Sequence, residues 1–247
     1  MATPIVTGNA ALVRQYLVDG FHQGRPINNP SSSLIRAIMY NGAAPLTHAT
    51  LHETNENIVT PSVPYDNHQG MGLVRLSSSL PLENENEFGM QIYDRVEIRD
   101  GDTHTYRFLI NDSCNSWDDI SATLVWLDPA ANSGCIRCLI NDLDLHLEIN
   151  DIKHYPNGMY SPDKLNTAER IRTQVYPGDY INVVISGSNI ATKASQNYSL
   201  VITGCFDELE QAVTVSLNEH FLNKTTMVIV VICLILVSWM LNNFLTR

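Results

Sequence analysis

The chain has 247 residues, of which 44% are hydrophobic and 17% charged, and its formal net charge is −11 at pH 7. This composition is typical of a folded protein rather than a disordered one. The acidic balance, and a sequence without any run of five Lys or Arg residues, argues against nucleic acid as a partner, because phosphate contacts need basic clusters.

The first 20 residues predict a helix whose first turn contains Ala2, Thr3 and Pro4. Pro4 suits the first turn, because its missing N–H is one of the unpaired donors of a helix start. Apolar residues then recur at three- and four-residue steps and predict one buried stripe: Ile5, Leu12, Val13, Tyr16 and Leu17.

A second helix is expected in NNPSSSLIRAIMYNGA, with one serine as its N-cap and Gly42 at its end. Its apolar stripe is formed by Leu34, Ile35, Ile38 and Met39. Residues 43–70 are rich in Thr, Asn, Pro and His and predict a loop. HQGMGLVRLSSSL then predicts a glycine turn and a short helix.

From about Met90 the hydrophobic period changes to two, which indicates strands. ISATLVWLD places Ile120, Ala122, Leu124 and Trp126 on one face. LDLHLEI alternates Leu143, Leu145, Leu147 and Ile149 with Asp144, His146 and Glu148. Short strands separated by turns, without helices between them, predict an antiparallel β-sandwich.

The polar face of the LDLHLEI strand raises the question of a cation. Asp142, Asp144, His146 and Glu148 offer oxygen and nitrogen ligands, so calcium binding is conceivable. The solvated side of an amphipathic strand is the preferred interpretation. We therefore expect no cofactor and no metal.

Four cysteines fall between residues 110 and 210: Cys114, Cys135, Cys138 and Cys205. They can form two disulfides in three connectivities, or remain buried thiols. CIRC, at residues 135–138, could also be a redox pair, but a structural disulfide or no bond is the preferred interpretation. Glycosylation sequons at Asn111 and Asn197 favour an extracellular or lumenal location of the folded domains.

The end of the chain contains TTMVIVVICLILVSWML, which has no charged residue. This length of apolar sequence predicts a single transmembrane helix over residues 225–245 and therefore a membrane as partner. One basic residue on each flank leaves its orientation undetermined.

The opening residues carry a resemblance to a known family. Met1, Ala2, Thr3 and Pro4 match the last four positions of Gly-Thr-Ser-Met-Ala-Thr-Pro, the nucleophile motif of the subtilisin-like serine peptidases, or subtilases. Later segments resemble that family in the same order, including SSSLIRAIMYNGA, HQGMGLVRLSSSL, ATLVWLDPA, LINDLDLHLEI and YPGDYINVVISG. The resemblance covers about residues 1–207, and its β region resembles the C-terminal jelly-roll of one subtilase branch.

The resemblance implies a domain organisation and a fold class. Residues 1–81 would be an α/β fragment, the C-terminal end of a subtilase catalytic domain, and residues 82–89 a linker. An all-β jelly-roll sandwich over 90–207 would follow, then a linker over 208–224 and the transmembrane helix.

The implied function is that of a membrane-anchored serine endopeptidase acting on protein or peptide substrates. The nucleophile would immediately precede Met1, and the family's catalytic Asp and His would lie further upstream. Met1 to Pro4 would support catalysis without being catalytic, so we expect this chain alone to be inactive. The alternative is a non-catalytic, membrane-tethered β-sandwich binding module, in which the helices expose apolar stripes.

Overall fold

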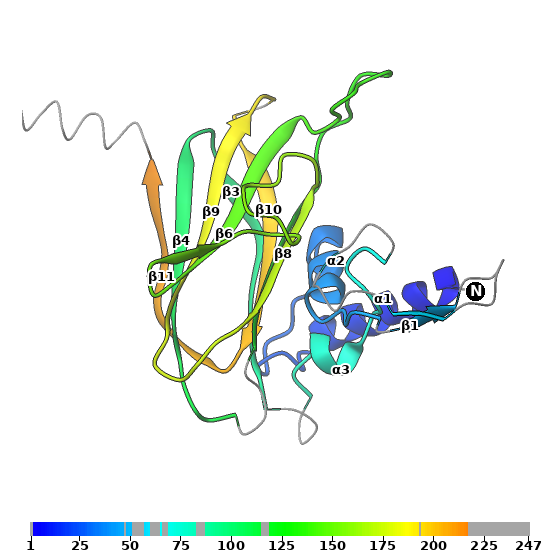
Figure 1. Cartoon of the computed structure of the whole chain (residues 1–247), viewed down its shortest axis with the longest axis vertical. Coiled ribbons are helices and arrows are strands. Elements are labelled where there is room, and N and C mark those ends of the chain that lie inside the picture. Colours follow the sequence, from blue (N-terminus) through cyan, green and yellow to red (C-terminus); the bar gives the residue numbers. More distant parts are fainter. Residues whose placement is uncertain are drawn as a thin grey trace, which may run out of the picture.

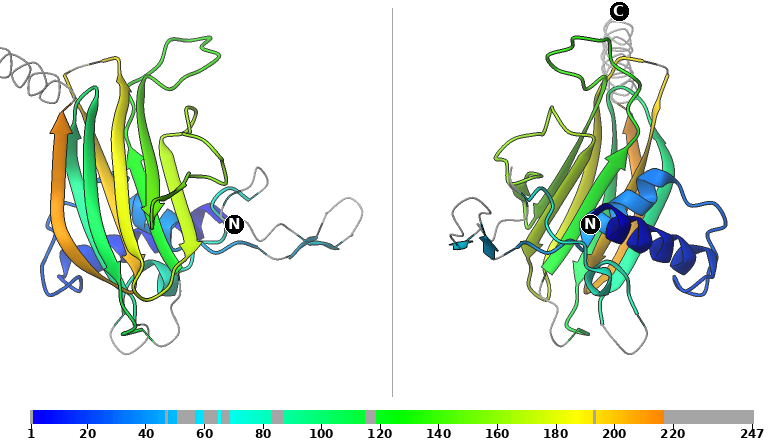
Figure 2. Two further views of the ribbon diagram at one scale, coloured as in Figure 1. Left: turned by 60° about the vertical axis from the view of Figure 1, so that its left-hand side comes forward. Right: turned by 90° about the vertical axis from the view of Figure 1, so that its right-hand side faces the viewer.

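The computed structural model describes residues 2–46, 48–50, 57–59, 65, 69–82, 87–114, 119–192 and 194–216, with the backbone alone for 48–50, 57–59 and 208–216. These residues form two β-sheets packed face to face, with a layer of helices on the outside of one sheet (Figure 1, Figure 2). The fold of the described residues is thus a β-sandwich with a helical cover.

The helical layer comes from the first 81 residues. Its elements are α1 (Ala2–Val18), α2 (Ser32–Asn41) and α3 (Leu76–Ser79). The predicted loop over 43–70 contains a small antiparallel hairpin, formed by β1 (His48–Thr50) and β2 (Asn57–Val59). The loop prediction is corrected at these six positions, where backbone pairing between two short segments forms a ladder.

The remaining strands build the sandwich. They are β3 (Gly89–Ile98), β4 (Asp102–Ile110), β5 (Asp119–Trp126), β6 (Asn141–Ile149), β7 (Ile152–His154), β8 (Ala168–Gln174), β9 (Tyr180–Ile190), β10 (Gln196–Gly204) and β11 (Phe206–Ser216). One sheet has the order β3-β10-β5-β8 and the other the order β11-β4-β9-β6-β7. All neighbouring strands are antiparallel.

The core between the sheets is formed by the residues that the two-residue period placed inward. Ile120, Ala122, Leu124 and Trp126 of β5 are fully buried, as are Leu143, Leu145 and Leu147 of β6, with Ile149 nearly so. The indole of Trp126 donates from Nε1 to the carbonyl oxygen of Asn141 at 3.0 Å, which satisfies its one polar group inside the core. The strand-face predictions are confirmed.

The outer face of the four-stranded sheet is buried as well, because α2 lies across β5 and β10. Leu34, Ala37 and Ile38 of α2 are fully buried against Val125 and Val201. The expectation that both helices expose their apolar stripes is therefore wrong for α2, since the sandwich itself covers it.

The predicted linker over 208–224 is also corrected in part. Residues 208–216 continue β11, which pairs with β4 from Phe206 to Ser216. The pairing protects backbone N–H and C=O groups of β4 that would otherwise be unpaired at a sheet edge.

The predicted transmembrane helix over 225–245 lies outside the described residues. Within the part of the chain that the structure describes, no helix is long and apolar enough to span a bilayer.

Candidate functional site

The start of α1 carries the residues that resemble the end of a nucleophile motif. Ala2, Thr3 and Pro4 form the first turn and are exposed, while Met1 lies outside the described residues. No acidic residue occurs in this first turn. The free N–H groups of the turn therefore present the positive end of the helix dipole to solvent.

The apolar stripe of α1 is divided into two halves. Val13 and Leu17 are fully buried and Tyr16 nearly so, whereas Ile5 is 64% exposed and Leu12 is 53% exposed. The predicted stripe is right for its C-terminal half and wrong for Ile5 and Leu12. The buried half packs in one apolar cluster with α2, and the described residues place no cover over the other half.

A hollow of about 420 Å³ adjoins the exposed part of α1. Its lining is mostly apolar: Leu12, Gln15, Tyr16, Phe21, Leu76, Leu80, Pro81 and Leu82. The hydroxyl of Tyr16 donates to the carbonyl oxygen of Pro81 at 2.9 Å and holds one wall in place. Exposed apolar patches of this kind are common where proteins contact a partner.

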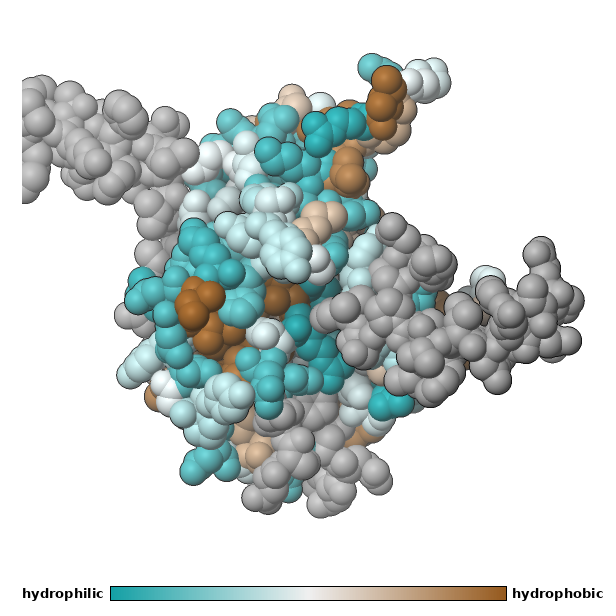
Figure 3. Space-filling model, viewed as in Figure 1, coloured by the Kyte–Doolittle hydropathy of each residue, from teal (hydrophilic) through white to brown (hydrophobic). Residues whose placement is uncertain are grey.

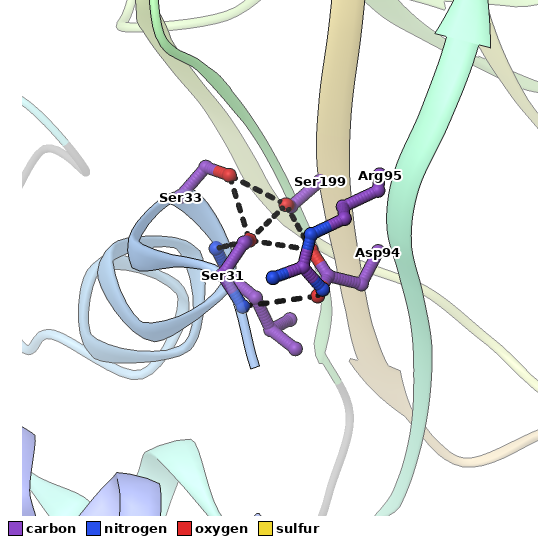
Figure 4. Close-up of polar contacts among 6 residues, drawn as sticks. Ser31, Ser33, Asp94, Arg95 and Ser199 are labelled. Atoms are coloured by element: carbon purple, nitrogen blue, oxygen red, sulfur yellow. Dashed lines mark hydrogen bonds and ion pairs between the residues drawn. The ribbon is translucent and has the colours of Figure 1, made fainter. Parts of the chain in front are cut away.

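The N-terminus of α2 contains a cluster of three serines and a carboxylate (Figure 4). Ser31 and Ser199 both donate from Oγ to Oδ1 of Asp94, at 2.5 and 2.8 Å. Ser33 Oγ lies 2.8 Å from each of those hydroxyl oxygens, so it donates to one of them. Oδ2 of Asp94 accepts from the backbone N–H of Ser31 and from Arg95 Nη1, each at 3.0 Å.

This cluster has the composition of a cap rather than of a catalytic site. Ser31 is the N-cap of α2, and its Oγ accepts from the backbone N–H of Leu34 at 3.0 Å. Its hydroxyl proton already goes to a carboxylate, and no imidazole is among its hydrogen-bond partners, so nothing there can activate it as a nucleophile. The prediction that a serine caps this helix is confirmed, with Ser31 as that serine.

The C-terminus of α2 is also held by the sandwich. Arg170 of β8 is 1% exposed and donates from Nη1 to the carbonyl oxygens of Tyr40, at 2.6 Å, and Ala43, at 2.8 Å. Asn41 donates from Nδ2 to Thr203 Oγ1 at 2.7 Å and accepts at Oδ1 from Thr123 Oγ1 at 2.9 Å. Arg170 therefore satisfies two carbonyl oxygens at the end of the helix, while the buried amide of Asn41 joins that end to β5 and β10.

The carboxyl groups considered for calcium form two different arrangements. Glu148 forms an ion pair with Lys153 Nζ at 3.3 Å, and its Oε1 also lies 3.4 Å from His146 Nε2, so other side chains already contact this carboxylate. Asp142 and Asp144 lie further along β6, where buried Glu169 of β8 accepts at Oε2 from the N–H of Leu145, at 2.6 Å. Among the described side chains, no three of His, Cys, Asp or Glu are arranged to hold a metal ion.

Burial controls the protonation of this second arrangement. It raises the pKa of Asp142 to about 6, and repulsion from Asp144 adds to the shift. Burial also raises the pKa of Asp144, and it raises the pKa of fully buried Glu169 well above the ordinary range. One oxygen of each carboxyl is buried without a hydrogen-bond partner, so the charged forms are disfavoured.

The cysteines pair in one of the three open connectivities. Cys114 bonds to Cys205, which joins the segment after β4 to the end of β10. Cys135 bonds to Cys138 inside the loop between β5 and β6. Periodicity and spacing alone could not choose this connectivity, because the choice depends on how the strand ends meet.

The two sequons lie at different kinds of position. Asn197 is exposed on β10. Asn111 is half-buried after β4, where its side-chain oxygen accepts from the N–H of Ser113 at 3.2 Å and from the hydroxyl of Ser113 at 2.7 Å. Modification of either asparagine remains a prediction.

Comparison with models of protein families finds no match. The chain is 30% identical over 223 residues to a protein of Dictyostelium discoideum named serine protease/ABC transporter B family protein tagA. It is 28% identical over 261 residues to tagD and 28% identical over 249 residues to tagB, which carry the same family name and come from the same organism. The alignments cover 81, 86 and 83% of this chain but only 12, 14 and 13% of the relatives, so the chain spans about an eighth of their length.

Proposed function

We propose that this chain is the C-terminal portion of a membrane-anchored, subtilisin-like serine endopeptidase. The names of the relatives support a protease-related function at a distant level. The observation that carries the proposal is α1 itself. The helix begins in a Met-Ala-Thr-Pro sequence, and its N-terminal half has an apolar face without a cover among the described residues.

In the proposed enzyme, residues 1–81 form the end of the catalytic domain, and the nucleophilic serine stands directly before Met1. Its Oγ would lie at the positive end of α1, which stabilises negative charge developing on the reacting groups. The histidine and aspartate that activate it would come from earlier in the protein. Protein or peptide chains would be cleaved through an acyl-enzyme.

The chain on its own would be inactive under this proposal. Acyl transfer needs a hydroxyl within reach of an imidazole that a carboxylate orients. The serine cluster at Ser31, Ser33 and Ser199 contains a carboxylate but no imidazole among its hydrogen-bond partners. Residues 1–81 therefore contribute support for a nucleophile rather than a nucleophile of their own.

The sandwich is proposed to be a jelly-roll. Its eight strands β3 to β10 divide into sheets of four with the orders β3-β10-β5-β8 and β4-β9-β6-β7, and β11 extends the second sheet beyond β4. Successive strands mostly cross from one sheet to the other, which supports a double-sheet Greek-key topology.

The sandwich would act as a rigid base for the catalytic end. It holds α2 at Asp94 and at Arg170, and α2 in turn packs against Val13 and Leu17 of α1. A displacement at either contact would move the start of α1. Catalysis is sensitive to such displacements, because a nucleophile misplaced by about 1 Å can cost a hundredfold in rate.

Membrane attachment through residues 225–245, with the folded domains in an extracellular or lumenal space, is part of the proposal. It is supported by the apolar sequence of that segment and by the two disulfides, which persist in oxidising compartments.

A membrane-tethered binding module is the second candidate. The apolar hollow beside α1 favours it, because a hollow lined by Leu12, Phe21 and Leu82 can accept a partner side chain. In that case the sandwich and its helical cover would be the working unit, and no acyl-enzyme would form.

Native protein from its source separates the two candidates. It is treated with a fluorophosphonate probe for serine hydrolases, resolved on a gel and detected with an antibody against residues 90–205. A labelled band much larger than 27.6 kDa is expected for the peptidase. A band near 27.6 kDa that the antibody detects but the probe does not label would support the binding module instead.

A further inference from the structure

The loop between β5 and β6 projects from one end of the sandwich (Figure 1). Its base is fixed by Asp128, which accepts at Oδ2 from the N–H of Ile140, at 2.6 Å, and at Oδ1 from the N–H of Asn141, at 2.8 Å. The Cys135–Cys138 disulfide lies in this loop. The two hydrogen bonds therefore close the base of the loop that carries the disulfide.

This disulfide cross-links no two elements of the fold, because its cysteines are only three residues apart in one loop. The Cys114–Cys205 bond spans 91 residues, and Cys205 is buried. In the chain-entropy account, stabilisation grows with the length of the closed loop, so the short ring contributes the less of the two. Opening Cys135–Cys138 leaves every strand pairing of the sandwich intact.

The surroundings of the short ring favour attack by a thiolate. Cys138 is exposed and Cys135 half-buried, while Ile136 between them is fully exposed. Figure 3 shows apolar surface on this projecting loop. Arg137 is the only charged residue from 129 to 140 in a chain of net charge −11. A positive charge at this point attracts an incoming thiolate and stabilises the thiolate that leaves.

We propose that Cys135–Cys138 is a thiol–disulfide exchange site. A thiolate attacks Sγ of the more exposed Cys138 and forms a mixed disulfide as the Cys135–Cys138 bond breaks. Cys135 leaves with the electron pair and takes a proton from solvent. A second thiolate of the reductant attacks the mixed disulfide, so that two thiols of the reductant become one disulfide and both cysteines become thiols. The reductant is a monothiol such as glutathione or a protein dithiol.

The test uses the full, oxidised chain in buffers with graded ratios of reduced to oxidised glutathione. Free thiols are blocked by acid quenching and alkylation, and each cysteine is quantified by mass spectrometry after trypsin digestion. Cleavage after Arg137 places Cys135 and Cys138 in separate peptides. The Cys135–Cys138 disulfide should open and close reversibly while the far-UV circular dichroism spectrum stays native. Its opening should be about tenfold or more faster than that of the Cys114–Cys205 disulfide.

Variants separate chemistry from structure. Arg137→Glu should slow attack by glutathione several-fold and Arg137→Lys should restore it, whereas Arg25→Glu, an equal charge change on an exposed residue of the helical layer, should leave the rate unchanged. Because Arg137→Glu removes the tryptic site, this variant is digested with an endoprotease that cleaves after glutamate, which again separates the two cysteines. The Cys135→Ser/Cys138→Ser double variant should keep the native spectrum. Ile136→Ser distinguishes the two kinds of reductant. If the reductant is a protein dithiol, this variant should slow reduction by thioredoxin but not by glutathione.

Two results would overturn the proposal. One is a Cys135–Cys138 bond that resists both glutathione and thioredoxin until the native spectrum is lost. The other is opening of all four cysteines together, or loss of the native spectrum in the double serine variant, since either would make the short ring a structural bond.

Discussion

Arg170 of β8 donates from Nη1 to the carbonyl oxygen of Tyr40, 2.6 Å away in the last turn of α2. The two residues are 130 positions apart, and the bond joins the sandwich to its helical cover. Burial lowers the pKa of Arg170 to about 10, which leaves the guanidinium charged at neutral pH. Together with Asp94 at the other end, it gives α2 a negative partner at its N-terminus and a positive partner at its C-terminus.

Arg170→Ala should destabilise the whole described fold. The substitution leaves two carbonyl oxygens without their charged donor, and bonds to charged groups contribute about 1.5–3 kcal/mol each. We expect a loss of about 2–4 kcal/mol in the free energy of unfolding, measured by urea denaturation. Arg170→Lys should lose less, because it keeps the charge. Equal losses for both variants would contradict a role of the charge.

Ser31→Ala should weaken the other end of α2. It removes the N-cap and one donor to Asp94, and loss of a cap typically costs about 1 kcal/mol. Ser133→Ala, in the exposed loop between β5 and β6, is the matched control and should leave the urea midpoint unchanged. Similar midpoints for the two variants would show that the serine cluster does not hold α2.

Asp142→Asn should stabilise the protein at neutral pH and not in acid. The folded-state pKa of Asp142 is raised from 3.8 to about 6, so its contribution to stability is present below pH 3.8 and is lost as the pH rises through 6. Asparagine imitates the neutral acid and avoids this loss. Thermal unfolding of both proteins in EDTA should give equal midpoints near pH 3.5 and a higher midpoint for the variant at pH 7.5. A lower midpoint at pH 7.5 would contradict the burial penalty.

Loss of the long disulfide should be more costly than loss of the short one. Cys114→Ser/Cys205→Ser removes a cross-link over 91 residues, and removing a native disulfide from a small domain typically costs about 2–5 kcal/mol. The measurement is urea denaturation beside Cys135→Ser/Cys138→Ser. The reverse ranking would show that the projecting loop stabilises the sandwich.

Leu12→Glu should leave folding intact but reduce self-association of the isolated chain. Leu12 is more than half exposed on α1 and adjoins the apolar hollow, so a charge there costs little in the folded state. Leu17→Glu, on the buried half of the same helix, should unfold the helical layer. Light scattering and circular dichroism distinguish the two effects. Unfolding by Leu12→Glu would mean that its side chain is covered.

The sequence alone predicted the inward faces of β5 and β6, because strict alternation over several residues specifies which side chains share a face. It did not reveal that the outer face of β5 is also buried. Ser121 and Thr123 on that face bond to Asn41, 80 and 82 positions away, and no local pattern encodes such a contact.

The apolar stripe on α1 also shows that a local sequence pattern does not reveal which surfaces are covered. The period of the helix grouped Ile5 and Leu12 with Val13 and Leu17, and the prediction of burial failed for the first two because a period does not say what covers each part of a face. The residues that hold α2, Asp94 and Arg170, escaped prediction because each lies on a strand far from the helix in sequence. Their strands, GMQIYDRVEI and AERIRTQ, contain other charged residues as well, so no local pattern distinguishes the two that bond to α2.

The position of the nucleophile can be determined in native protein. Native protein labelled with a fluorophosphonate probe is digested with trypsin, and the modified peptide is sequenced by mass spectrometry. We predict an adduct on a serine followed immediately by Met-Ala-Thr-Pro, in a peptide that ends at Arg14. An adduct on a serine within residues 1–247, or a native protein that takes no probe at all, would show that the nucleophile does not stand before Met1.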